Sequence, residues 1–530
     1  MNRILRRVNK KVSLGGAATL LIGTSMFGQA LGFLRLKLVN ANFSPVGPQS
    51  TDAYFAAFKI PDFFFFTLAA GALGVAFMPI LADHLERSDR KGVWELTSSL
   101  LNLLAVLMAV VAVIIIVFAE PLLHYVVAPK LSPEQLHNAA TIMRLIAINP
   151  LLFTISGIIT SVQQTFGRFF FYALAPLFYN VSIIISIYVF KDNIGIIGLG
   201  IGALAGAVFQ VLIASLGLFG TGFKYIPKIT WKSPDFRLIL RQLPPRSIDQ
   251  GIDSLNSIVE TNFARRLGEG NISYYENAYT LHTAPTLLIG TAVSTAAFPR
   301  LTKRLAQGRV DLFRRDFLRI LRVMIWLIAP ITVVSYFARG YLARMIFSRG
   351  SPQIATIFGY LIMAIFFRTL YAIISRWFYA QKDTKTPLLV SLFSIALNIF
   401  LAYTLSRPTA YGVAGLAMAQ SLVAMAEVVV LFTIMVLRDH KLLDQAFLSG
   451  CAKIISVTGF SVIAAFLMVS FFPLGLNDRG VIVLGSKLGI ISVVTLTVHV
   501  TLSSLFGLEE AAVVIDKIRK FILRPIKVPF

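Results

Sequence analysis

The sequence predicts an all-α membrane protein that crosses the bilayer many times. Only 14% of its 530 residues are charged and 56% are hydrophobic, whereas about a quarter of the residues in soluble domains are charged. The mean hydropathy is +0.76. The apolar residues also gather in long runs, and a helix of about 20 apolar residues is long enough to span a bilayer. Composition and run length together exclude an ordinary soluble domain.

Fourteen apolar segments meet this length criterion and are separated by shorter polar connections. The first follows a basic N-terminus and is too long for the apolar core of a signal peptide, so we expect a retained helix. The predicted transmembrane segments, in chain order, are 13–39, 52–82, 94–118, 138–163, 170–190, 195–219, 240–267, 272–298, 318–338, 352–379, 386–405, 411–437, 450–473 and 481–506.

The connections predict how the chain is oriented. Alternate loops are rich in Lys and Arg, whereas the loops between them carry fewer, and 40–51 has none. Lys and Arg concentrate in cytoplasmic loops, so both termini are expected in the cytoplasm. This distribution also accounts for the net charge of +24, and no nucleic-acid partner is expected. The basic segment 300–322 is either an amphipathic helix on the inner membrane surface or a loop that sets the topology.

A weak internal repeat divides the chain. Sliding the sequence by roughly 220 residues places Tyr54 on Tyr274 and Pro79 on Pro299. Six helices in each half predict two lobes related by a pseudo-two-fold axis along the membrane normal, an architecture found in alternating-access transporters. Channels and structural membrane proteins can also be duplicated. The predicted units are an N-terminal lobe at 1–222, a C-terminal lobe at 223–440, and 441–530, which holds two further helices and a basic cytoplasmic tail.

The segment 52–82 carries charges that are costly at membrane depth. Asp52 and Lys59 lie two helical turns apart and therefore share one face of a helix. Arg35, in the preceding segment, follows the stretch GQALGFL, which is small and polar on one face. These charges are expected either to face a functional cavity or to form structural pairs, such as Asp52 with Arg35.

The segment 240–267 is the most polar of the predicted helices. Its polar residues recur at intervals of three or four and therefore form a stripe along one helix face. Each charge at the bilayer centre costs about 2.5–3.5 kcal/mol, so the stripe cannot face lipid. It lines a water-filled cavity or pairs with other helices. The stripe consists of Arg246, Asp249, Gln250, Asp253, Asn256 and Glu260; further along the chain, Asn398, Gln420 and Glu427 are interhelical hydrogen-bonding groups or ion ligands.

No pattern in the sequence indicates an enzyme. The chain has no phosphate-binding loop for ATP hydrolysis, no Ser/His/Asp, zinc or haem pattern, and one cysteine, Cys451. We expect no cofactor and no bound metal. Active transport would then depend on an ion gradient or the membrane potential, with Na+ or H+ as the coupling ion. Asp52, Asp253 and Glu260 are the candidates for binding that ion.

The stretches TDAYFAAFKIPD (51–62), AAGALGVAFMPIL (69–81) and FYAQKDTKTP (378–387) are the most distinctive motifs of the chain. They resemble the MurJ/MviN family of lipid II flippases, in the multidrug/oligosaccharidyl-lipid/polysaccharide exporter superfamily. The resemblance implies a flippase of the bacterial cytoplasmic membrane that moves lipid II, a polyprenyl-diphosphate-linked peptidoglycan precursor, from the inner to the outer leaflet. Its partners would be lipid II and membrane lipids, and we expect a monomer.

The resemblance also implies roles for individual residues. Arg35, Asp52 and Lys59 match cavity residues of the family, and the last two helices match a groove for the lipid tail. Glu260 and Asn398 match a sodium site of the family, in which Gln420 replaces a small hydroxyl residue. The complete predicted substrate-binding set, which includes part of the polar stripe, is Arg35, Asp52, Lys59, Arg246, Asp249 and Asp253.

The chain departs from the family pattern where the diphosphate would bind. Typical members carry arginines at the positions of Gln29, Phe65, Phe66 and Ala278, and a glutamate at the position of Ala70. Arg suits diphosphates because its planar donors bind two oxygens at once, so the usual diphosphate clamp is largely missing. Typical members lack an arginine at the position of Arg246, and we hypothesise that Arg246 supplies part of the head-group recognition.

Three functions are therefore compared. The first is a flippase for lipid II or another polyprenyl-diphosphate glycan. The second is a multidrug or other solute exporter of the same superfamily, which would need a more apolar, acidic cavity. The third is a non-transporting scaffold in cell-envelope synthesis, which would fill its cavity with side chains; the run FFFF at 63–66 fits this scaffold or the exporter.

Overall fold

The computed structural model describes residues 14–70, 77–512 and 515–516. All regular elements in these ranges are helical, which confirms the all-α fold class. Ten helical segments within the described residues are long and apolar enough to cross a membrane. Each of the fourteen predicted segments contains helix, but this criterion does not select all of them, so the count of fourteen stays a prediction.

The chain packs into two units, Met1–Ser273 and Tyr274–Phe530. The first unit holds α2 (Leu14–Asn42), α3 (Thr51–Phe65), η1 (Phe66–Ala70), α4 (Met78–Glu86), α5 (Arg90–Pro121), η3 (Leu122–Val127), α6 (Pro133–Ile146), α7 (Asn149–Thr165), α8 (Phe170–Phe190), α9 (Ile197–Leu216) and α10 (Pro234–Arg266). The helices that follow are α11 (Asn271–Pro285), η4 (Thr286–Thr291), α12 (Ala292–Ala306), α13 (Val310–Phe337), α14 (Arg339–Ile346), α15 (Ser351–Ala380), α16 (Lys385–Leu405), α17 (Val413–Arg438), α18 (Gln445–Phe471) and α19 (Val481–Leu505).

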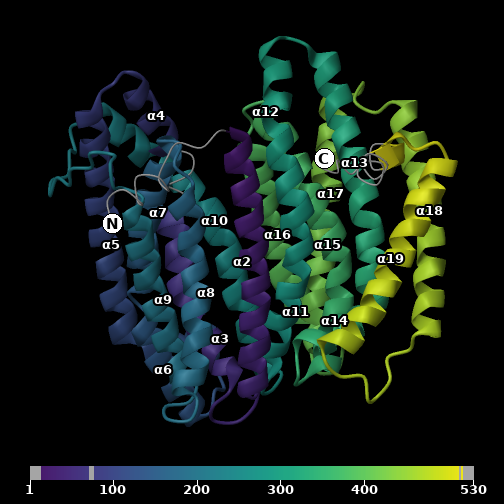
Figure 1. Ribbon diagram of the computed structural model, residues 1–530, viewed down its shortest axis with the longest axis horizontal. Helices are drawn as coiled ribbons and strands as arrows, with labels where there is room; N and C mark the ends of the chain where they lie inside the picture. The colour runs from purple at the N-terminus through teal and green to yellow at the C-terminus, as the bar shows by residue number, and fades with distance from the viewer. Residues whose placement is uncertain (1–13, 71–76, 513–514, 517–530) are drawn as a thin grey trace, which may run out of the picture. The chain divides into compact units, whose positions relative to one another are not determined.

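In the first unit, α9 packs against α7 and α8, and α7 packs against α5 (Figure 1). Trp94, Leu100 and Phe236 lie in a buried apolar cluster that joins α5 to the start of α10. The helix α10 also lies against the π-helical turn η1, where a Cβ on Gly251 would come within 2.6 Å of the Thr67 hydroxyl. Packing thus groups α10 with the first unit, whereas the repeat assigns it to the second lobe. The predicted lobe boundary at 222 describes the repeat and stays a prediction.

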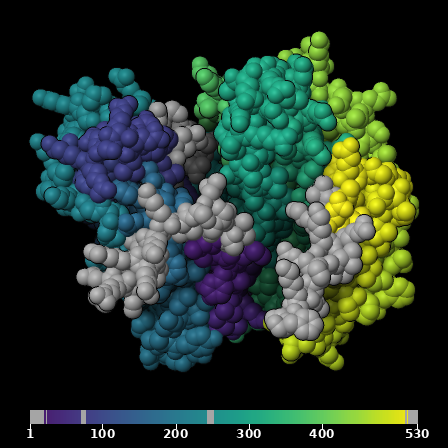
Figure 2. Space-filling model, turned by 45° about the horizontal axis from the view of Figure 1, so that its top comes forward, coloured from purple at the N-terminus to yellow at the C-terminus, as the bar shows by residue number. Residues whose placement is uncertain are grey.

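The second unit repeats this order of contacts. Here α17 packs against α15 and α16, and α15 packs against α13. Phe317, Trp377 and Leu431 lie in the buried apolar cluster that these helices share. The two additional helices, α18 and α19, lie side by side in Figure 1, and α19 is the yellow surface in Figure 2. Both also pack against α13, so the last two predicted helices join the second unit.

The repeat is most visible in two interrupted helices. The order α3–η1–α4 recurs as α11–η4–α12, and each π-helical turn follows a helix that contains a proline, Pro61 or Pro285. Proline removes one backbone donor and crowds the preceding turn, and a local π-helical adjustment is one way in which a membrane helix re-satisfies the freed backbone groups. These interruptions lie in the two segments that the sequence repeat had aligned.

The basic segment 300–322 does not form a separate surface helix, so that alternative is wrong. Its first half ends α12 and its second half begins α13, with a turn at Gln307–Arg309 between them. Gly308 adopts a φ of +69° there, a left-handed conformation that glycine takes without steric cost. The segment 138–163 is also divided, into α6 and α7, because Pro150 begins a new helix.

Candidate functional site

At the start of α3, the carboxylate of Asp52 accepts hydrogen bonds on both of its oxygens. Ser50 caps this helix, which places Asp52 in its first turn. Asp52 Oδ1 accepts hydrogen bonds from the backbone N–H and hydroxyl of Ser273, at 2.8 and 2.7 Å, and Oδ2 accepts from Gly270 N at 2.7 Å. The Asp52 side chain is fully buried. Its partners lie just before and within the first turn of α11.

Arg265 supplies the positive charge beside Asp52. Its Nη1 lies 3.3 Å from Asp52 Oδ2, and its side chain is only 3% exposed. The remaining guanidinium donors bind the Lys130 carbonyl at 3.0 and 2.8 Å and the Gln135 side chain at 2.7 Å. The network therefore fastens α3, the start of α6 and the end of α10 together.

This network resolves one alternative left open by the sequence. Asp52 pairs with Arg265, and no ion pair joins it to Arg35 among the described residues, so the suggested Asp52–Arg35 pair is wrong. Arg265 was missed because it lies beside Arg266 at the end of the predicted segment 240–267, where a basic residue commonly ends a helix in water. The available signal was the cost of the Asp52 charge at membrane depth, since a carboxylate removed from water requires a charged or hydrogen-bonding partner.

Arg35 and Lys59 have different surroundings in the same unit. Lys59 Nζ donates a 2.7 Å hydrogen bond to Ser257 on α10. Arg35 and Asp62 lie close enough to Tyr54 and Tyr179 for their charges to act on both phenols. No hydrogen bond or ion pair joins Arg35 to another residue within the described ranges. Arg35 therefore belongs to α2, which packs against α8, and Lys59 belongs to α3, which packs against α10.

The polar stripe of α10 is only partly described. Asp253 is exposed, whereas Asn256 and Glu260 are buried and joined by a 3.0 Å hydrogen bond from Asn256 Nδ2 to Glu260 Oε1. The backbone at Arg246 and Asp249 is helical, but their side chains lie outside the described residues. Their predicted roles in substrate binding therefore stay predictions, as does that of Asp253.

The second unit contains a buried polar cluster around Arg368 of α15. Its Nη1 lies 3.2 Å from Glu427 Oε2, and its Nη2 donates to the Gln420 side chain at 3.4 Å. Ser391 donates to the other Glu427 oxygen at 2.9 Å. Arg368 was also missed, although one arginine within an apolar predicted span was a visible signal.

The proposed cation ligands come from both units. Glu260 belongs to α10, whereas Asn398 and Gln420 belong to α16 and α17, where both are buried. The amide oxygen of Gln420 accepts a hydrogen bond from Arg368, so a positive group already lies beside it. The three-residue cation site stays a prediction. Within the described residues, no group of three or more His, Cys, Asp and Glu side chains is arranged to hold a metal ion.

Aromatic side chains stand where the family pattern predicts arginines in α3. The ring of Phe65 packs edge-on against Phe153 of α7 at 5.7 Å, and Phe153 packs in the same way against Tyr179 of α8 at 5.3 Å. Phe66 contacts Phe65 and is 40% exposed. These phenylalanines join helices within the first unit by apolar contact.

Comparison with known proteins identifies the family. A family model described as "Lipid II flippase MurJ" matches residues 48–479. The chain belongs to this family. It is 26% identical over 405 residues to the lipid II flippase MurJ of Burkholderia cenocepacia, covering 73% of this chain and 76% of that relative. It is 24% identical over 483 residues to a probable lipid II flippase MurJ of Rhizobium meliloti, covering 88% of each chain.

Solved structures share the fold. A lipid II flippase MurJ in an inward closed conformation matches with a TM-score of 0.75 and 22% identity, over 92% of this chain and 98% of that one. An inward-facing multidrug resistance MATE family transporter matches with a TM-score of 0.64 and 16% identity, over 78% of this chain and 95% of that one. The predicted superfamily fold is confirmed, and the family model favours the flippase over the multidrug exporter.

Proposed function

We propose that this chain translocates lipid II from the inner to the outer leaflet of the bacterial cytoplasmic membrane. The observation that carries the proposal is the flippase family match over residues 48–479. The relatives named as lipid II flippases cover most of this chain and most of their own length.

The proposed mechanism is alternating access. Lipid II carries an anionic diphosphate, and Arg35 and Lys59 of the first unit are cations that would meet it. Arg35 has no protein anion bonded to it in the described part of the chain, so its guanidinium donors remain available to phosphate oxygens. Lys59 is held by Ser257 of α10 and would contribute a point charge.

Arg246 would compensate for the missing arginines. Phe65 is packed between helices by its contact with Phe153 and cannot bind phosphate. A cation on the polar face of α10 would restore part of the recognition. Arg246→Ala should then weaken transport, whereas Arg246→Lys should retain part of it because the charge is kept.

The remaining features of the proposal concern energy and topology. Transport would be driven by an ion gradient or the membrane potential, with Na+ or H+ coupled through Glu260, Asn398 and Gln420. Both termini would lie in the cytoplasm, as the basic loops indicate, and the chain would act as a monomer.

Complementation tests the function directly. The chain is expressed in a strain depleted of its own lipid II flippase, and growth and externally accessible lipid II are measured. We expect growth to be restored by the wild-type chain and lost with Arg35→Ala and Arg246→Ala. Correct membrane insertion with no growth and no lipid II at the outer leaflet would contradict the proposal. Growth with Arg246→Ala would contradict only the role of Arg246.

A further inference from the structure

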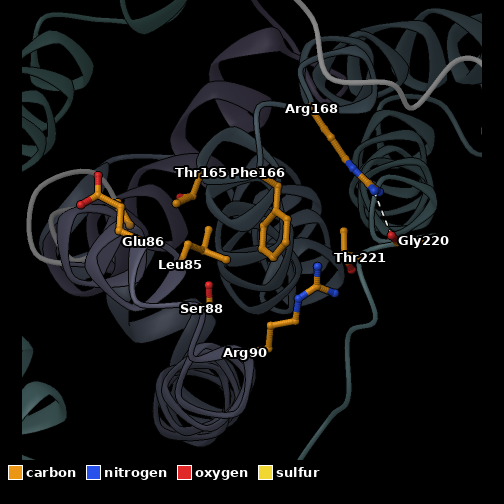
Figure 3. Close-up of a pocket in the computed structure, with 10 residues that line it drawn as sticks. Leu85, Glu86, Ser88, Arg90, Thr165, Phe166, Arg168, Gly220 and Thr221 are labelled. Carbon is orange, nitrogen blue, oxygen red and sulfur yellow. Dashed lines mark hydrogen bonds between the residues drawn. The ribbon is translucent and has the colours of Figure 1, made fainter.

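We propose that the first unit holds an anionic phospholipid head group in a pocket between the ends of α4, α5, α7 and α9. The proposal concerns a structural lipid and does not rest on the proposed transport function. It comes from an open cavity of about 470 Å³, which falls within the size range of small-molecule sites. The side chains that face it are drawn in Figure 3.

Two arginines give the pocket its charge. Figure 3 shows Arg90 and Arg168 entering from opposite sides, with both guanidinium groups directed toward Gly220 and Thr221. No ion pair joins either arginine to a carboxylate among the described residues. Glu86 also lines the pocket, but its carboxylate points away from both arginines in Figure 3. An anion is therefore the ligand that this charge favours.

Arg168 shapes the pocket as well as charging it. Its Nη1 donates to the Phe219 carbonyl at 2.6 Å and its Nη2 donates to the Gly220 carbonyl at 2.9 Å. These bonds hold the turn after α9, in which Gly220 has a φ of +76°. Burial lowers the pKa of Arg168 from its usual value. The backbone carbonyls occupy only part of its five N–H donors and do not cancel its charge, so the pocket stays electropositive and further donors remain for an anion.

Arg90 is the more available of the two cations. It is exposed, and its Nη1 lies 3.8 Å from the position that a Cβ on Gly222 would occupy. Its side chain thus crosses from the start of α5 to the turn after α9, and no hydrogen bond joins it to another residue in the described ranges. The Ser88 hydroxyl lies beside it at the pocket wall. A phosphodiester could accept hydrogen bonds from Arg90, Arg168 and Ser88 at once.

The position of the pocket favours a lipid over a soluble phosphate compound. Its residues stand at the ends of three candidate membrane spans, Arg90–Val127, Pro133–Thr165 and Ile197–Leu216. Trp94 stacks on Phe166 of the pocket wall at 5.6 Å, and Trp residues concentrate at membrane–water boundaries. Basic pockets between membrane helices are known recognition sites for anionic head groups. A lipid phosphate would reach this depth without leaving the bilayer.

The corresponding corner of the second unit supports this assignment. There the loop between α15 and α16 carries Asp383, whose Oδ2 accepts a 2.5 Å bond from Arg438 at the end of α17. The protein thus supplies its own anion in the second unit. In the first unit, the loop between α7 and α8 carries Arg168 at this position, and the anion must come from outside.

Lipid binding to the purified full-length chain tests the proposal. The chain is placed in phosphatidylcholine nanodiscs and titrated with phosphatidylglycerol, and retained lipid is measured by native mass spectrometry. Arg90→Ala should lower phosphatidylglycerol retention about fivefold and Arg90→Glu about tenfold or more. Arg87→Ala is the matched control, because Arg87 is an exposed cation in the turn just before α5 and does not line the pocket.

Two outcomes would overturn the proposal. One is equal phosphatidylglycerol retention by the wild-type chain, Arg90→Glu and Arg87→Ala. The other is a thermal stabilisation by inorganic phosphate, in phosphatidylcholine alone, that matches that of phosphatidylglycerol and requires Arg90, since the ligand would then be a soluble phosphate. Melting curves in phosphatidylcholine alone show that the variants are folded. Every variant keeps Arg168 and its hydrogen bonds to the Phe219 and Gly220 carbonyls.

Discussion

The arginine–carboxylate pair at Asp52 in the first unit and the pair at Glu427 in the second unit are built differently. In the first unit, Asp52 and Arg265 are 0% and 3% exposed, and other donors and acceptors occupy both groups. In the second unit, Glu427 is 2% exposed whereas Arg368 is 26% exposed. In the first pair both side chains are buried in protein, whereas in the second pair the carboxylate is buried and the arginine is partly exposed.

The two pairs therefore differ in how easily their charged groups can change partners. Removing one partner of a buried pair leaves an uncompensated charge, which costs more than the pair itself contributes. Asp52 and Arg265 cannot change partners without breaking several bonds to Gly270, Ser273 and Lys130. Arg368 can move between Glu427, Gln420 and solvent at smaller cost. We therefore expect the first pair to contribute more to stability than the second.

The largest predicted effect comes from Asp52→Ala. The substitution removes the acceptors of Gly270 and Ser273 and leaves the buried Arg265 with only the half-exposed Glu269 carboxylate, at 3.5 Å, as an ion partner among the described residues. We therefore expect a loss of about 3 kcal/mol of stability, the lower end of the cost of breaking a buried ion pair. The melting temperature of the purified chain measures it. Asp253→Ala is the matched control, because Asp253 is an exposed aspartate in the same unit. Equal melting temperatures for the two variants would show that the Asp52 network does not fasten the helices.

A smaller effect is predicted for Glu427→Gln. The amide keeps a hydrogen-bonding group beside Ser391, and the partly exposed Arg368 can turn toward water, so we expect a loss of about 2–3 kcal/mol. Asp52→Asn provides the comparison at the pair of the first unit. Our distinction fails if Glu427→Gln is the more destabilising of the two amide substitutions in the same melting experiment.

The helices were largely predictable because hydropathy over some 20 residues is a strong signal. The predicted span 170–190 coincides with α8, and 386–405 differs from α16 by one residue at its start. The π-helical turns were not predicted, although Pro61 and Pro285 mark the helices that precede them. Their form depends on how the chain absorbs a missing hydrogen bond, and a hydropathy pattern does not contain that information.

The site was less predictable because its contacts join distant parts of the sequence. The charge pattern singled out Asp52 as either a cavity residue or a member of a structural pair, and the structure shows a buried pair with Arg265. Its partner Arg265 lies 213 residues away, at the end of a predicted helix where a basic residue gives no sign of burial. Arg368 was hidden for the opposite reason, because the apolar run around it dominated the prediction of a span. Which arginine pairs with which carboxylate depends on tertiary packing, and the sequence pattern does not specify that packing.

A third prediction uses pH to test an ion pair outside the membrane spans. Burial alone would raise the pKa of Asp383, but the Thr386 donors and Arg438 lower it to about 2. Because the folded pKa is depressed, its stabilisation is fully present above about pH 4 and is lost as the pH falls toward 2. Since Arg438 is half-exposed, we expect only about 1–2 kcal/mol.

The variant Asp383→Asn isolates this contribution. The melting temperatures of the wild-type chain and of Asp383→Asn should differ by a constant amount at pH 7 and pH 5. The difference should shrink at pH 3, because there the carboxyl of the unfolded chain takes up a proton while the carboxyl of the folded chain is still ionised. A difference that grows on acidification would mean that the pKa of Asp383 is raised, and would contradict the ion pair with Arg438.

The smallest effect on stability is predicted for Arg35→Ala. Arg35 is a partly buried cation, yet no bond joins it to another described residue, unlike the paired arginines Arg265 and Arg368. Its removal should change stability by less than about 0.5 kcal/mol. Complementation should nevertheless be lost if Arg35 meets the lipid diphosphate. Lys37→Ala, on the same helix, controls for loss of one positive charge and should complement. A marked fall in melting temperature for Arg35→Ala would instead show that Arg35 stabilises the folded chain, as Arg265 does. Loss of complementation could then no longer be assigned to a missing contact with the lipid diphosphate.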